Sequence, residues 1–394
     1  MGVAFLKDIE LSGRRVLIRA DFNVPLKENG KISDDNRIKQ FLPTLRYILE
    51  RKAKPILMSH LGRPGGKPDM ALSLRPIAET LSTLLKQDVI LAQGIVGQEV
   101  EDQVERLQPG QVLLLENLRF NPGEQRNDPE FCQQLARTAD VFVNDAFGTS
   151  HRPHASIIGV PRLFKQKAAG LLMQKELEYY ERALVKPRQP FCMILGGVKV
   201  ATKLNALIKL ADRVDKVIIG GAMANTFLAA QGLQMGRSRF ESDLFQRALE
   251  LIAILARRDC KLYLPVDFMV GPSPNAHGLG RAVPAQEIPA DTMALDIGPA
   301  TSLLFKEALH TAETIVWNGP MGVFENEDFS KGTTDMIEHL SSAHGVTVAG
   351  GGDTDAAIHA MQLGHKFNFI STGGGALLQL MEGRGLPGLE VLKS

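Results

Sequence analysis

The chain has 394 residues, 44% apolar and 23% charged, a balance that excludes a disordered chain, a coiled coil and a collagen-like fibre. Its 45 Lys and Arg residues against 44 Asp and Glu leave a net charge of +1, so bulk charge supports no general affinity for nucleic acid or an anionic membrane. At roughly 150 residues per domain, the length predicts about two to three domains.

The first residues and the cysteines indicate a reducing cytoplasm. Residues 1–10 lack the apolar stretch of a secretory signal, and the longest mostly apolar run, 217–230, is too short to span a bilayer. Cys132, Cys192 and Cys260 are odd in number and lack metal-type spacing, so we expect neither a disulfide framework nor a zinc site. The expected location is the cytoplasm.

The first half of the chain alternates short apolar runs with amphipathic stretches. The runs, four to eight residues long and typical of strands buried on both faces, end at Phe22, His60, Leu118 and Phe147. Residues 37–52 and 74–84 have the apolar spacing of helices. Residues 171–186 are predicted to form a long helix, which Pro187 and Pro190 end, and we expect it to bridge two α/β domains.

The second half repeats this alternation, with a helix predicted around 204–211. Its strand-like runs, which mostly end in glycine, are 191–197, 216–221, 262–268, 314–320, 346–351 and 367–375. Strand–helix alternation over the whole chain predicts parallel sheets with helices on both faces.

Basic side chains gather at the ends of the first-half strands. Arg37, Arg63, Arg119 and Arg152 each stand at a strand end or helix start, accompanied by three histidines, His60, His151 and His154. A lone arginine there is usually a surface ion pair, but four favour a concave site for phosphate or carboxylate. Asp21 and Asn23 add groups that hold hydroxyls, so the expected ligand is a small phosphorylated, hydroxylated acid.

Glycine clusters mark the second half. They begin at Gly196, Gly220, Asn318, Gly350 and Ser371. One cluster is equally well explained as a tight turn, but five after strands favour a nucleotide-phosphate site, because glycine lets backbone N–H groups approach an anion.

Three charged residues accompany these glycines. Lys199 and Lys203 lie four apart, on one helix face, and either face solvent or suit a polyanion. Asp353 either caps a helix or holds Mg²⁺ beside phosphates.

Nine motifs in order make the chain resemble the phosphoglycerate kinase family. They are RADFNVP, SHLGRP, ENLRF, NDAFG-x-x-HR-x-HAS, LGG-x-K-x-x-x-K, GGAMANTF, WNGPMGVFE, GGGDT and STGGGA. The resemblance, which runs from Val16 to Leu392, implies two doubly wound, Rossmann-like α/β domains joined by a long helix and hinge. Residues 1–170 would bind 3-phosphoglycerate, 171–186 would form the interdomain helix, 187–378 would bind MgADP or MgATP, and 379–394 would return to the first domain.

The resemblance also implies residue roles. Substrate binding falls to Asp21, Asn23, Arg37, His60, Arg63, Arg119 and Arg152. Nucleotide binding falls to Gly197, Lys203, Gly221, Asn318, Pro320, Glu325, Gly351, Gly352, Asp353 and Thr354. Arg37 and Lys199 would stabilise the phosphoryl group in transfer, with the backbone of Gly373 and Gly374, and Asp353 would hold Mg²⁺. The chain departs from the family pattern at Leu377 and Gln379, where serine and glutamate are typical.

The implied reaction is direct, reversible phosphoryl transfer from 1,3-bisphosphoglycerate to ADP, a step of glycolysis and gluconeogenesis. We expect a monomer that closes about its hinge, with no nucleic acid or membrane partner. Two alternatives are disfavoured by the residues. A nicotinamide-dependent dehydrogenase would have a glycine fingerprint after its first strand, where this chain has DFNVP, and a non-catalytic binding protein would lack charge at Arg37, Lys199, Lys203 or Asp353.

Overall fold

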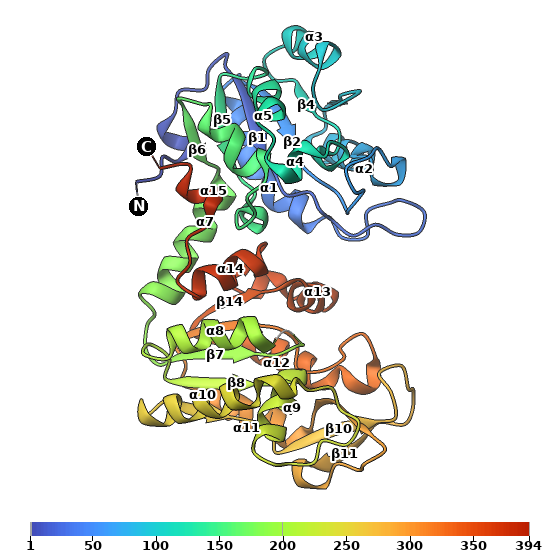
Figure 1. Cartoon of the computed structure of the whole chain (residues 1–394), viewed down its shortest axis with the longest axis vertical. Coiled ribbons are helices and arrows are strands. Elements are labelled where there is room, and N and C mark those ends of the chain that lie inside the picture. Colours follow the sequence, from blue (N-terminus) through green and yellow to red (C-terminus); the bar gives the residue numbers. More distant parts are fainter. Residues whose placement is uncertain (1, 199, 394) are drawn as a thin grey trace. The chain divides into compact units, whose positions relative to one another are not determined.

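The structure, a computed structural model, describes residues 2–198 and 200–393, and these form two compact units. Unit 1 contains the residues up to Leu177 and those from Gly385 onward, and unit 2 runs from Glu178 to Arg384. Each unit is built on a six-stranded parallel sheet, which confirms the α/β class (Figure 1). No helix in the described ranges is long and apolar enough to cross a membrane.

Unit 1 has one parallel sheet with helices between its strands. The strands are β1 (Arg15–Arg19), β2 (Lys54–Met58), β3 (Val89–Leu91), β4 (Val112–Leu114), β5 (Val141–Asn144) and β6 (Lys167–Ala169). The helices are α1 (Asn36–Glu50), α2 (Arg75–Leu85), α3 (Gln98–Arg106), α4 (Gly123–Arg126), α5 (Pro129–Ala136), α6 (Val160–Arg162), α7 (Leu171–Tyr180), which continues into unit 2, and α15 (Pro387–Glu390). The strand order is β3-β4-β2-β1-β5-β6.

The core of unit 1 follows from the alternation of side chains along each strand. Val16 and Ile18 of β1 pack in one cluster with Phe41 and Leu45 of α1, while Leu17 between them is equally buried on the opposite face. Burial on both faces explains why the run is apolar without alternation. The helices predicted over 37–52 and 74–84 are confirmed as α1 and α2.

The two ends of the chain meet in unit 1 (Figure 1). Val3 and Lys393 form an antiparallel bridge. The Asn144 side chain donates to the Gly388 carbonyl at 3.1 Å, and the Gly388 N–H donates to the Ser150 carbonyl at 2.9 Å. The last turn of the chain is therefore tied to the carboxyl end of β5.

Unit 2 has a parallel sheet and a smaller antiparallel one. The parallel strands are β7 (Phe191–Leu195), β8 (Lys216–Ile219), β9 (Lys261–Tyr263), β13 (Thr314–Asn318), β14 (Val346–Gly350) and β15 (Phe369–Ser371), in the order β15-β14-β13-β7-β8-β9. The antiparallel strands are β10 (Asp267–Gly271), β11 (Arg281–Pro284) and β12 (Met293–Ile297). The helices are α8 (Val200–Leu210), α9 (Gly221–Ala230), α10 (Phe245–Arg257), α11 (Pro299–Leu309), α12 (Lys331–Ser341), α13 (Gly352–Ala360) and α14 (Gly374–Met381).

One predicted strand is wrong. The sequence predicts a single buried strand over 262–268, but this run contributes β9 to the parallel sheet and the start of β10 to the antiparallel one. Pro265 separates the two because proline has no N–H to give to a strand ladder. The chain leaves the first sheet there.

Bridging the units in sequence, α7 starts at Leu171 as predicted, and residues Glu181–Val185 follow it as a π-helical turn. Pro190 follows a cis peptide bond with Gln189.

The core of unit 1 gives a stability prediction. Leu57 of β2 is fully buried between Ile18 of β1 and Leu114 of β4, so Leu57→Ala should lower the free energy of unfolding by about 2–5 kcal/mol. The control is Ile90→Ala on the edge strand β3, where 38% exposure should keep the loss well below that. Urea unfolding should be followed by circular dichroism, because the single tryptophan, Trp317, lies in unit 2. Equal losses in the two variants would contradict this account of the core.

Candidate active site

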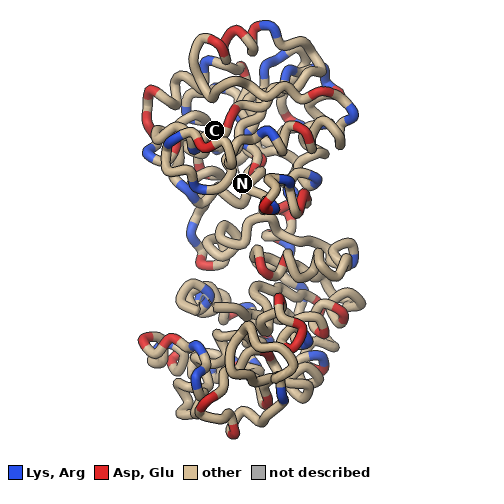
Figure 2. The backbone as a smooth tube through the Cα atoms, turned by 90° about the vertical axis from the view of Figure 1, so that its right-hand side faces the viewer, with Lys and Arg blue, Asp and Glu red and all other residues tan. Residues whose placement is uncertain are grey.

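The four arginines predicted to bind an anion follow the carboxyl ends of neighbouring strands. They are Arg37 after β1, Arg63 after β2, Arg119 after β4 and Arg152 after β5. In the order β4-β2-β1-β5, the loops that follow each strand meet at one edge of the sheet. Basic and acidic residues are otherwise interspersed along both units (Figure 2), so this is a local concentration of charge.

Asp21, which follows β1, pairs with the first turn of α1. The Arg37 guanidinium donates to Asp21 Oδ2 at 2.8 Å, and the Asp21 side chain is almost buried. The neighbouring Asn23 side chain accepts the Gly62 N–H at 2.9 Å, which joins the loops after β1 and β2. The sequence-predicted residues Asp21, Asn23 and Arg37 are thus brought together.

His60, just after β2, is buried beneath the arginines. Burial lowers its pKa well below the ordinary value, and the charges of Arg19, Arg119, Arg152 and Arg37 lower it further. The imidazole is therefore neutral at physiological pH. Of these four guanidiniums, Arg19 is in direct contact with the ring, its Nη2 lying 3.2 Å from His60 Nδ1.

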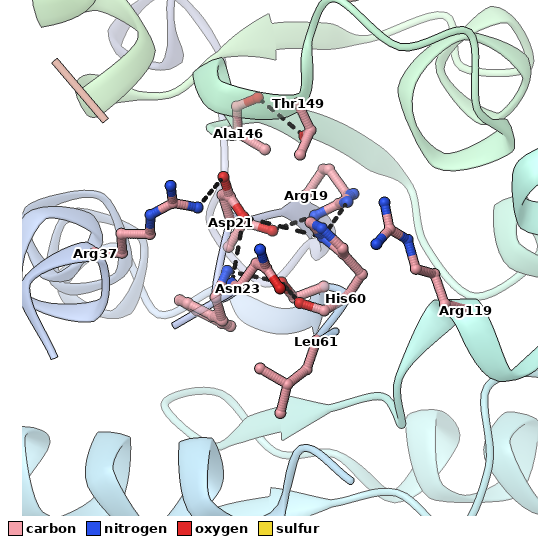
Figure 3. A network of polar contacts seen from close by, with 12 residues as sticks. Arg19, Asp21, Asn23, Arg37, His60, Leu61, Arg119, Ala146 and Thr149 are labelled. Carbon is pink, nitrogen blue, oxygen red and sulfur yellow. Dashed lines mark hydrogen bonds and ion pairs between the residues drawn. The ribbon is translucent and has the colours of Figure 1, made fainter. Parts of the chain in front are cut away.

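Arg119 has hydrogen bonds left to make. It donates to the Gly62 carbonyl at 2.6 Å, but its buried Nε has no hydrogen-bond partner among residues 2–198 and 200–393. Burial, then the charges of Arg152 and Arg19, lower its pKa to about 10, and Arg63 acts in the same direction. Figure 3 shows Arg37 and Arg119 reaching toward Asp21 and His60 from opposite sides. Guanidiniums that repel one another, one of them with an unused donor, are suited to binding an anion.

Sequence reasoning missed one member of this cluster. Arg19, 1% exposed, is the last residue of β1, and its guanidinium lies against His60 (Figure 3). The same guanidinium donates to the Ser156 hydroxyl. This arginine stands inside the apolar run that ends at Phe22. An arginine within a run otherwise buried on both faces is the signal that would have found it, since buried charges are rare unless paired.

In unit 2, five predicted nucleotide residues line one cavity of about 370 Å³. They are Gly197, Gly221, Pro320, Glu325 and Asp353. They come from the loops after β7, β8, β13 and β14, which are neighbours in the sheet.

Close backbone approach requires glycine at the cavity. Gly221 has φ +58°, and a Cβ there would lie 2.5 Å from the Gly197 nitrogen. The Gly197 N–H donates to the Pro320 carbonyl at 2.9 Å. The three loops are therefore locked together by main-chain contacts that no larger residue permits.

The remaining predicted nucleotide-binding residues are not among those that line the cavity. Lys203 lies in α8, Asn318 ends β13, and Gly351, Gly352 and Thr354 lie at the start of α13. Lys203 donates to the Gly196 carbonyl. Thr354 accepts the Gly319 N–H at 2.8 Å, and the buried Asn318 Nδ2 has no partner in the described part of the chain. A Cβ on Gly351 would lie 3.4 Å from that nitrogen.

Two backbone segments of this edge touch directly. A Cβ on Gly374, at the start of α14, would lie 2.6 Å from the Gly351 Cα, so Gly373 and Gly374 adjoin the turn that holds Gly351 and Gly352. Lys199, the predicted catalytic lysine, lies outside the described residues.

Asp353 is the residue suited to a cation. It is exposed in the first turn of α13, lines the cavity, and has no ion pair or hydrogen bond to its carboxylate within the described ranges. No group of three or more His, Cys, Asp or Glu side chains there could hold a metal ion alone. Mg²⁺ is commonly held by one or two carboxylates together with substrate phosphates, so the donor set fits a metal that arrives with a nucleotide.

Comparisons with known proteins agree with the motifs. The family model for phosphoglycerate kinase matches residues 6–384. A phosphoglycerate kinase of a Nitratiruptor species is 49% identical over 396 residues, which cover 100% of this chain and 99% of that protein. One of Pelotomaculum thermopropionicum is 50% identical over 387 residues, 98% of each chain.

Solved structures are similar over the same length. The phosphoglycerate kinase of Coxiella burnetii matches with a TM-score of 0.85 and 39% identity, covering 99% of this chain and 98% of that one. The one from Pyrococcus horikoshii OT3 matches with a TM-score of 0.88 and 34% identity at the same coverage.

The glycine contact in unit 2 can be tested with a matched pair. Gly221→Ala and Gly232→Ala both place a side chain at positive φ, which should cost each variant about 1 kcal/mol of stability, and the backbone clash should add to that loss in Gly221→Ala alone. Only Gly221 faces a neighbour, since a Cβ on Gly232 meets nothing within 4 Å. We therefore expect Gly221→Ala alone to weaken MgADP binding, by about tenfold or more in calorimetric titration. Equal affinities in the two variants would show that the close approach does not shape the cavity.

Proposed function

The chain belongs to the phosphoglycerate kinase family and has phosphoglycerate kinase activity, which is a step of glycolysis, and we propose on that premise which residues perform the phosphoryl transfer. Unit 1 binds 3-phosphoglycerate or 1,3-bisphosphoglycerate, and unit 2 binds ADP or ATP with Mg²⁺. The observation that carries the proposal is the group of arginines at the strand ends: Arg37 lies 2.8 Å from Asp21 Oδ2, Arg19 lies 3.2 Å from His60 Nδ1, and the buried Nε of Arg119 has no partner among the described residues.

The substrate site has a division of labour. Arg63, Arg119 and Arg152 supply positive charge and unused N–H donors for the phosphate and carboxylate. Asp21 and Asn23 hold the hydroxyl and the neighbouring loop. Arg37, held at the mouth of the site by Asp21, is placed to neutralise the phosphoryl group that moves.

The nucleotide site uses backbone more than side chains. The Gly197 and Gly221 amides already donate to the Pro320 and Met321 carbonyls, so these two glycines serve close approach. The phosphate oxygens are bound by the remaining amides at the helix starts, with Gly351 and Gly352 at the start of α13, as helix N-termini bind anions. Lys203, Asn318, Pro320, Glu325 and Thr354 complete it, with Glu325 at the ribose. Asp353 would hold Mg²⁺, which when bound neutralises phosphate charge.

The chemistry needs no general base. In the direction that consumes ATP the nucleophile is a carboxylate, already ionised at neutral pH, so the neutral His60 need not accept a proton. Arg37, Lys199 and the amides of Gly373 and Gly374 are left with positioning and charge stabilisation, which dominate phosphoryl transfer. Transfer is direct, without a covalent enzyme intermediate, and requires a closing motion that lets the two ligands meet.

The test of the function is ATP formation from ADP and 1,3-bisphosphoglycerate in a coupled assay. Absence of ATP formation by the folded chain would refute the proposal. We further propose that the chain acts as a monomer in the cytoplasm, which sedimentation at working concentration and cell fractionation test.

Arg37 is the first residue to test. Arg37→Ala should raise the barrier to transfer by about 3–4 kcal/mol, which lowers kcat some hundredfold or more, while leaving MgADP affinity little changed. Lys199→Ala should behave alike. Lys39→Ala, an exposed cation two residues along the same helix that pairs only with Asp35 among the described residues, is the control and should keep kcat. A normal kcat in Arg37→Ala would remove that residue from the mechanism.

Asp353 gives a metal-specific prediction. In Asp353→Asn, MgADP should bind about tenfold more weakly, whereas ADP in excess EDTA should bind as tightly as it binds wild type. Titration of each form against both proteins isolates the metal-dependent part of the affinity. If Mg²⁺ raised the ADP affinity of Asp353→Asn as much as it raises that of the wild type, the Asp353 carboxylate would be excluded as a metal ligand.

A further inference from the structure

A chain of hydrogen bonds runs behind the substrate site of unit 1 and ends on a buried carboxylate. Glu124 of α4 is 1% exposed. Its Oε1 lies 2.6 Å from the Ser156 hydroxyl and its Oε2 accepts the Ser156 N–H at 3.0 Å. A carboxylate can only accept, so the Ser156 proton points to Glu124 and the lone pairs of that hydroxyl remain for another donor.

That donor is Arg19. Its Nε donates to Ser156 Oγ at 2.8 Å, its Nη1 to the Ala20 carbonyl, and its Nη2 lies 3.2 Å from His60 Nδ1. The Asp21 Oδ1 atom lies 3.9 Å from His60 Nδ1, beyond hydrogen-bond distance. Arginine has no acceptor, so at 3.2 Å His60 Nδ1 accepts from Arg19. Burial and the surrounding guanidiniums lower the pKa of His60, so the ring is neutral and its one proton sits on Nε2.

We propose that Glu124, Ser156 and Arg19 are positioning residues that hold His60 as the neutral Nε2–H tautomer, a donor to an oxygen of the bound phosphoglycerate. The inference rests on the proposed function of this site. Neither Glu124 nor Ser156 need touch the substrate, because they act through Arg19.

The tautomer matters because every polar group of the glycerate ligand presents oxygen. An Nε2–H donates to a phosphate or carboxylate oxygen, whereas the other tautomer would present a lone pair and leave two acceptors facing each other. The buried negative charge of Glu124 also favours the charged forms of Arg19 and Arg119. A neutral side chain at 124 would leave Arg19 buried with less compensation.

The first test reads the tautomer directly and needs no catalysis. The full chain, with its nine histidines labelled with ¹⁵N, is studied by long-range ¹H–¹⁵N correlation without substrate between about pH 6 and 8, and His60 is assigned by its loss in His60→Gln. We expect a neutral ring protonated on Nε2. A proton on Nδ1, or an imidazolium, would overturn the proposal even if the chain is an active kinase.

The second test uses variants in the coupled assay. Glu124→Gln should raise KM for 3-phosphoglycerate about tenfold, the cost of a disturbed hydrogen bond to a charged group, and leave KM for MgATP little changed. Ser156→Ala should act alike. The double variant should have a KM for 3-phosphoglycerate no higher than that of the more damaging single variant, because both substitutions interrupt the same chain of hydrogen bonds.

Glu130→Gln is the matched control, since Glu130 is exposed on α5 six residues along, and it should keep both constants. Additive effects of the two single variants, an unchanged KM for 3-phosphoglycerate, or an equal rise in both KM values would overturn the proposal. If Glu124→Gln does not fold, the test is the ¹⁵N spectrum of His60 in Ser156→Ala. We expect that variant to lose the single Nε2–H form, and an unaltered His60 ring would refute the proposal. Loss of ATP formation in the wild type would instead refute the proposed function.

Discussion

Repulsion among the arginines of unit 1 constrains the rest of the site. The guanidiniums lie near enough to lower the pKa of Arg119 to about 10, a shift to which burial contributes most. Two carboxylates offset part of this charge, Asp21 by its ion pair with Arg37 and Glu124 through Ser156. The positive charge that the two carboxylates leave uncompensated attracts an anionic ligand. The same charge causes the repulsion among the arginines, so the affinity of the site and its internal repulsion have one origin.

Unit 2 solves a related problem with different groups. A nucleotide phosphate partly neutralised by Mg²⁺ is bound well by many weak donors at short range. Backbone amides at helix starts are such donors, and they do not repel one another as like charges do. The requirement is close approach, and it is met where a Cβ on Gly221 or Gly374 would strike neighbouring backbone. The small phosphorylated acid proposed for unit 1 has fewer groups to hold and calls for charge instead. On the proposed assignment of ligands, the difference between arginine-rich and glycine-rich strand ends reflects the chemistry of the two ligands.

The strength and the failures of sequence reasoning have physical causes. Buried parallel strands leave unalternated apolar runs, so the α/β class and the helix α1 were predictable from residues alone, and the order of motifs added the family. Arg19 was missed because it sits within such a run, and Glu124 because its partner Ser156 is 32 residues away and no local pattern joins them. The short strands β10 to β12 form antiparallel pairs outside the main sheet, where strand–helix alternation carries no information. Lys199, which the motifs single out, lies outside the described residues.

The histidines of the cluster bear on how the site responds to pH. Burial and nearby arginines lower the pKa of His60 and bring that of His154 to about 4. His154 is therefore neutral from about pH 5 upward, His60 is neutral at physiological pH, and the arginines stay charged. The protein side of the anion site therefore keeps one charge state across the physiological range. A phosphate monoester gains its second negative charge near pH 6. The pH dependence of binding is therefore set by the ligand and not by the protein, and we expect the affinity to rise as the phosphate ionises. Because the reaction moves no proton to the enzyme, a site of constant charge loses nothing in catalysis.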